Sequence, residues 1–243
     1  MWGFFQAEAT RLSVWLAAQP GLAQDLEDAV GVAIAEYDWT SWEELRPSLQ
    51  PVLEEQFAQG ATSVLDALAA TGVDLGTAFV ATEAQVWAEA RAAELVGTGT
   101  RAGWSLTQTT RDELRTDLEA WLREGLSWLD IARRIRQGDY GTFMPAYRAR
   151  MIARTESALA YGNGNVASMR AAGVREVRIF DGVRWDEPCR EADGATWTLD
   201  RYAANVLQHP NCARVATAIM PEMSKAAPPD PGHLPALGWA EGP

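Results

Sequence analysis

Apolar side chains recur every three or four residues through roughly the first 170 residues of this 243-residue chain, and this period is the strongest constraint on its fold. In residues 75–97, for example, Val80, Ala84 and Leu95 fall on one side of a helix. The pattern changes in residues 174–185, where apolar and polar side chains alternate as they do in strands. We therefore expect a mainly α fold, with a long helical N-terminal region followed by a small α+β lobe that contains a short antiparallel sheet.

Capping and turn residues set the expected boundaries of these elements. Ser127 and Asp130 are placed to cap a short helix that stops at Gly138. Thr109 or Thr110 is placed to cap the helix before it. Further helices are expected over residues 2–18, 21–37, 47–71, 75–97 and 144–172, and strands in residues 174–185, 194–199 and 212–220. A turn is expected at Asp181-Gly182 and a hairpin turn at Asp193-Gly194.

Composition divides the chain into three regions. The net charge of −12 is concentrated in residues 1–100, whereas residues 101–184 carry an excess of arginine. The glycine-rich stretch "GTGTRAGWS", residues 97–105, separates the two and is the best candidate for a boundary. We expect an acidic helical region at residues 1–100, a second domain at residues 101–220, and an extended tail rich in proline and glycine at residues 221–243.

Several classes of function are disfavoured by the sequence. The acidic N-terminal half should repel nucleic acid. No apolar run approaches the roughly 20 residues that span a bilayer, so no membrane partner is expected. The chain also has no G-x-S-x-G, no P-loop and no G-x-G-x-x-G before a helix, and we expect it not to be an enzyme.

The segment "RARMIARTE", residues 148–156, carries charges that need partners. Arg150 and Arg154 are four residues apart and share a helix face, where like charges repel unless an anion lies between them. Glu156 points away from Arg154 and falls near apolar side chains, so it needs a donor from elsewhere. We expect an internal salt-bridge network that joins this helix to the C-terminal lobe. The alternative is phosphate or DNA binding, to which further arginines would contribute: Arg133, Arg134, Arg136 and Arg148.

Both cysteines and one histidine lie in the stretch between Cys189 and Cys212, and three interpretations stay open. With His209 they could bind zinc, helped by a carboxylate from Asp186, Glu187 or Asp193, and this metal could serve a nuclease or hydrolase. Alternatively, the cysteines form a disulfide once the protein leaves a reducing cytosol. In the third interpretation, they are small buried groups beside a turn at His209-Pro210.

Three aromatic side chains stand at the start of the chain: Trp2, Phe4 and Phe5. In sequence terms, nothing precedes them against which they could pack. An exposed apolar terminus is typical of a docking site, so we expect these residues to bind a partner protein.

The order of these motifs resembles that of the phage Mu F-like head morphogenesis family of minor capsid proteins. The family pattern is a helix with R-A-x-x-I-A-R-T-E, then G-V and a strand, a segment from tryptophan to cysteine, D-G, and a terminal H-P-x-C. The resemblance covers residues 105–219 of this chain. The matching elements are Arg148 to Asn165, Gly173-Val174, Trp185 to Cys189, Asp193-Gly194 and His209 to Cys212.

The resemblance implies a non-enzymatic minor head protein of a tailed phage. It would bind the portal or the major capsid protein, with packaged DNA as a further contact, in several copies around a symmetric assembly. It would reside in the virion, in the head interior or near the portal, and in the host cytoplasm during assembly. Residues shared with the family would form a structural network: Arg150, Arg154, Glu156, Asn165, Trp185 and Asp193.

One departure from the family pattern bears on the metal hypothesis. Many members carry further cysteines at the positions of Ala192 and Arg214, so a four-cysteine site cannot be complete here. We therefore expect Cys189 and Cys212 to lie close together in the fold, held by packing rather than by zinc, and we expect no cofactor.

Overall fold

The computed structural model describes residues 2–19, 26–97, 105–141, 146–181 and 186–220. Within these ranges the chain is mainly helical and has one small antiparallel sheet near its C-terminal end, so the predicted fold class is confirmed. The predicted tail at residues 221–243 lies outside them. The elements are α1 (Trp2–Ala17), α2 (Leu26–Glu36), the 3-10 helix η1 (Thr40–Leu45), α3 (Arg46–Ala69), α4 (Val80–Val96), α5 (Leu106–Arg123), α6 (Trp128–Arg136), α7 (Ala146–Ala171), β1 (Glu176–Phe180), α8 (Glu187–Ala192), β2 (Thr196–Thr198), α9 (Leu199–Ala204) and β3 (Val215–Ile219).

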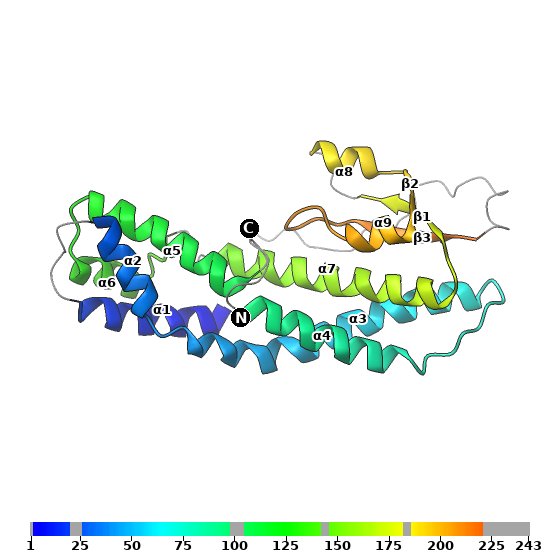
Figure 1. Ribbon diagram of the computed structural model, residues 1–243, viewed down its shortest axis with the longest axis horizontal. Helices are drawn as coiled ribbons and strands as arrows, with labels where there is room; N and C mark the ends of the chain where they lie inside the picture. Colours follow the sequence, from blue (N-terminus) through cyan, green and yellow to red (C-terminus); the bar gives the residue numbers. More distant parts are fainter. Residues whose placement is uncertain (1, 20–25, 98–104, 142–145, 182–185, 221–243) are drawn as a thin grey trace.

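The molecule is elongated, with α1, α2, α5 and α6 gathered at one end and α3, α4 and α7 packed side by side along the other (Figure 1). The sheet and α9 lie against α7, and α8 lies farther from it (Figure 1). One apolar core fills the first end, and a second lies between α3, α7 and the sheet. Both cores combine residues from before and after residue 100. The predicted division between residues 1–100 and 101–220 is therefore one of composition and not of packing.

α3 and α7 approach each other so closely that two glycines have no room for a side chain. A Cβ atom at Gly60 would overlap the backbone carbonyl of Tyr161, and one at Gly164 would overlap that of Phe57. One turn after Gly164, the Ser168 hydroxyl of α7 donates a 2.9 Å hydrogen bond to the Ala61 carbonyl of α3. α7 is thus fixed to the N-terminal region by direct backbone packing.

The sheet explains the alternating pattern in the sequence. β1 lies between β2 and β3 and pairs antiparallel with both. Val177 and Ile179 of β1 are fully buried, in the same core as Val166 and Met169 of α7. Arg178 between them lies on the opposite face and is only partly buried, as the alternation of a strand requires. The three predicted strands are confirmed in position.

The predicted turn at Asp193-Gly194 does not join two strands, so the hairpin interpretation is wrong. These residues connect α8 to β2, with Gly194 in the left-handed region at φ 77° and its N–H donating to the Ile179 carbonyl. Neither α8 nor α9 was expected, because six residues are too few to show a helical period. The other predicted turn includes Gly182, which lies outside the described residues.

The predicted helix ends are partly right. Ser127 and Asp130 form a reciprocal capping box at the start of α6, and Gly138, with φ 92°, follows its end. At α5, however, Ser105 is the cap, and its side chain accepts from the Gln108 N–H. The prediction of Thr109 or Thr110 as the cap is wrong because α5 begins one turn earlier.

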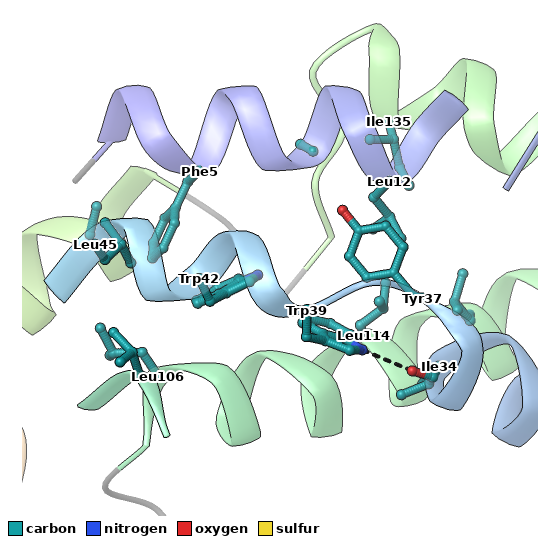
Figure 2. Packing of buried hydrophobic residues seen from close by; sticks show 14 of the residues in the cluster. Phe5, Leu12, Ile34, Tyr37, Trp39, Trp42, Leu45, Leu106, Leu114 and Ile135 are labelled. Carbon is teal, nitrogen blue, oxygen red and sulfur yellow. Dashed lines mark hydrogen bonds between the residues drawn. The ribbon is translucent and has the colours of Figure 1, made fainter. Parts of the chain in front are cut away.

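The N-terminal aromatic residues pack against the protein's own core: Phe5 is buried (Figure 2), and Trp2 and Phe4 are half-buried, so they do not form the exposed apolar terminus on which the docking prediction was based. Phe5 is 1% exposed and lies 5.9 Å from Trp42 between ring centroids. Phe4 meets the edge of the same ring, and Trp2 packs against Tyr140. The premise that nothing is available to pack against them fails because η1 and α6 bring distant aromatic and apolar side chains onto α1.

Candidate functional site

The buried carboxylate of α7, Glu156, has its partner on α4. Glu156 accepts two hydrogen bonds from Arg91 of α4, at 2.8 Å from Nε and 2.7 Å from Nη2. The two side chains are only 5% and 10% exposed. Arg91 also pairs with Glu94, at 2.6 Å. The predicted salt bridge of Glu156 therefore exists, but it joins α7 to the N-terminal helices and not to the C-terminal lobe.

Arg91 was missed by the sequence analysis, although a signal was present. It stands among Ala88, Ala92 and Leu95 on the apolar side of α4, where a charge needs a buried partner. Residues 1–100 contain only three basic residues, Arg11, Arg46 and Arg91. Few residues of this region could therefore have been the partner of Glu156.

The arginines proposed as phosphate contacts have different environments. Arg148 is buried and donates to the Thr109 hydroxyl at 2.8 Å, and burial lowers the pKa of its guanidinium group. On α6, Arg133 pairs with Asp130, and Arg134 pairs with Asp139 and Glu124. Arg136, Arg150 and Arg154 are exposed. Arg148 is therefore not on the open surface, and a phosphate contact of these arginines stays a prediction.

Two other predicted network residues can be placed. Asn165 is buried in α7, and its side-chain oxygen has no hydrogen-bond donor among the described residues. The Asp193 carboxylate accepts from the Asp181 N–H at 3.0 Å and so fixes the end of β1 to the α8–β2 connection. Trp185 lies outside the described residues.

Cys189, His209 and Cys212 come together at the edge of the lobe, with one ligand atom of each within 4.8 Å of the others. Cys189 projects from α8, while His209 and Cys212 lie in the segment between α9 and β3. The His209 Nε2 atom is 3.2 Å from Cys189 Sγ and 2.7 Å from a carboxylate oxygen of Asp186. The predicted proximity of the two cysteines is confirmed.

The backbone around this cluster is held by side-chain hydrogen bonds. Asp186 caps α8 by accepting from the Cys189 N–H at 2.8 Å, and this bond, with the nearby His209, lowers the pKa of the Asp186 carboxyl. Asn211 adopts a positive φ of 62°, and its N–H donates to the Thr155 hydroxyl of α7. The loop that carries His209 and Cys212 is thereby fixed to α7.

A buried ion pair lies directly behind the cysteines. Arg214 Nε donates to Asp181 at 2.9 Å, and both side chains are fully buried. Another nitrogen of Arg214 lies 3.9 Å from Cys189 Sγ, and Cys212 Sγ lies 3.9 Å from Asp181. Burial, together with the carboxylates of Asp186 and Asp181, raises the pKa of the Cys189 thiol.

A cavity of about 650 Å³ opens beside the cluster, between α5, α7 and residues 207–210. Arg148, Glu113 and His209 contribute to its wall. Ser105 also lines it, but its hydroxyl donates to the Gly97 carbonyl and caps α5, so it is not placed as a nucleophile.

Among the described residues, no helix is both long enough and apolar enough to span a bilayer.

No protein-family model matches the chain, and no curated protein or solved structure matches it. The resemblance to the phage Mu F-like family therefore rests on the motif residues of the sequence and stays a prediction.

Proposed function

We propose that this chain is a non-enzymatic minor head protein of a tailed phage, bound at the portal or to the inner surface of the capsid. The observation that carries the proposal is that residues of the family motif make contacts inside the protein. Glu156 pairs with Arg91 and so joins α7 to α4. Asp193 accepts a hydrogen bond from the Asp181 N–H and so fixes the end of β1. Side chains that serve internal architecture in this way support a structural role for the motif.

The DNA-binding alternative has less support. Arg148 is buried, and Arg133 and Arg134 are already paired with carboxylates. Phosphate binding would have to replace those ion pairs, which reduces the gain from each contact. We therefore propose a protein partner and treat any DNA contact as secondary.

Affinity purification tests this proposal. The chain, with a C-terminal tag, is expressed in cells in which the phage or prophage that encodes it assembles heads, and bound proteins are identified after crosslinking. We expect the portal protein or the major capsid protein to be enriched over a matched purification with an unrelated helical bait. Enrichment of neither protein while heads are assembling would contradict the proposal.

A further inference from the structure

We infer that Cys189, His209, Cys212 and Asp186 form a structural zinc site. These side chains come from two segments, and the structure brings three of their ligand atoms within 4.8 Å of one another. A tetrahedral zinc ion with N, O and S ligands requires separations of about 3.3 to 3.8 Å between ligand atoms. The longest separation in the cluster would have to shorten, while the 2.7 Å between His209 and Asp186 and the 3.2 Å between His209 and Cys189 would have to lengthen slightly. This inference does not depend on the proposed role in the phage head.

The contacts of His209 are compatible with a metal ion between these groups. The Nδ1 atom lies 2.7 Å from the Pro210 carbonyl, which can only accept, so Nδ1 carries a hydrogen. In a neutral ring the Nε2 atom then presents a lone pair. That lone pair faces an Asp186 oxygen at 2.7 Å and Cys189 Sγ at 3.2 Å. A lone pair and a carboxylate repel each other at that distance unless a proton or a metal ion lies between them.

The chemistry of the ligands favours zinc over a proton. Two sulfur atoms, an imidazole nitrogen and a carboxylate are the ligands that zinc takes in proteins. On binding, each thiol transfers its proton to solvent and the two thiolates coordinate the metal. The contact from His209 Nδ1 to a carbonyl is the outer hydrogen bond that typically orients a metal-binding histidine.

The guanidinium group of Arg214, on the buried side of the cluster, would stabilise the thiolate form of Cys189. Its guanidinium group is fixed by Asp181 and by the Asn205 carbonyl, with one nitrogen 3.9 Å from Cys189 Sγ. A cationic donor near sulfur stabilises a metal-bound thiolate. The sequence argument against zinc assumed that the positions of Ala192 and Arg214 had to supply sulfur. Of the carboxylates that the sequence offered as a further ligand, Asp186 is the one that the structure places beside His209, 2.7 Å from its Nε2 atom.

The proposed site is structural because protein side chains fill all four positions. Both cysteines are buried, and His209 and Asp186 lie on the outer side, about one third exposed. Zinc would join α8 to the segment between α9 and β3, and so fix the edge of the lobe.

Metal analysis of the purified full-length protein tests this inference. We expect one zinc ion per chain in protein purified without chelator, and loss of that zinc in Cys189→Ser and Cys212→Ser. The matched control is His233→Ala, which alters the chain's other histidine and should keep the metal. Asp186→Asn preserves a capping side chain and should weaken zinc binding at least tenfold, whereas its exposed neighbour Glu187→Gln should leave binding unchanged.

If the variants fail to fold, metal binding by the wild-type protein still tests the inference. Cobalt added to the zinc-free protein should give the visible bands of a tetrahedral ion and a thiolate charge-transfer band in the near ultraviolet. A wild-type protein that takes up neither zinc nor cobalt overturns the inference, as does a mass that shows a Cys189–Cys212 disulfide in the freshly isolated protein. Unchanged zinc affinity in Asp186→Asn overturns the closed, four-ligand site.

Discussion

Adding a single methyl group at Gly164 should lower the free energy of unfolding by about 3 kcal/mol or prevent folding, because the contact between α3 and α7 cannot relax around it. The new Cβ would lie 2.8 Å from the Ala61 nitrogen and closer still to the Phe57 carbonyl. These are backbone atoms of α3, so no rotamer change relieves the overlap. The two helices would have to separate, which would loosen both cores. Chemical denaturation of Gly164→Ala measures the effect.

Two further alanine variants make this experiment specific. Gly60→Ala places a methyl group on the other side of the same contact, against the Tyr161 carbonyl, and should be about equally damaging. Gly31→Ala in α2 meets no atom within 4 Å and should stabilise the protein slightly, because alanine favours a helix over glycine by about 1 kcal/mol. If Gly164→Ala is as stable as the wild type, α3 and α7 do not pack as described.

Removing the Glu156 carboxylate should cost about 3 kcal/mol of stability, the lower end of the range for breaking a buried ion pair. In Glu156→Leu the charge of Arg91 remains buried without its bidentate partner, although Glu94 still binds one of its nitrogens. The double variant Arg91→Met with Glu156→Leu replaces both charges by apolar groups and should recover most of the loss. Thermal and urea denaturation of the single and double variants measure this coupling.

The exposed pair formed by Arg123 and Glu119 on α5 is the control for this comparison. Arg123→Ala should change stability by less than about 1 kcal/mol, because solvent screens a surface ion pair. An equally small effect of Glu156→Leu would contradict the assignment of Arg91 and Glu156 as the buried link between α4 and α7.

The local features of the fold could be predicted from the sequence. Period, caps and glycine stops depend on neighbouring residues, so the long helices, the capping box at Ser127 and the strand around Val177 are where the sequence places them. Errors arose where two local signals competed, as with Ser105 and Thr109. They also arose where an element was too short to show a period, as in α8 and α9.

Contacts between distant residues could not be predicted in the same way. Glu156 needed a partner, but choosing Arg91 required knowing that α4 packs beside α7. Phe5 looked exposed because its partner Trp42 is brought to it only by the fold. In the candidate metal site, the sequence identified Cys189, His209 and Cys212, but it did not show that Asp186 faces His209.

The amount of this chain in purified phage heads tests the proposed function most directly. Heads and head precursors are isolated by density gradient from cells that carry the gene, and peptides of this chain and of the portal protein are quantified against isotope-labelled standards. A minor head protein should be present in precursor heads at a fixed, low ratio to the portal, repeated across preparations. A level no higher than that of contaminating host proteins, in precursor and mature heads alike, would contradict the account.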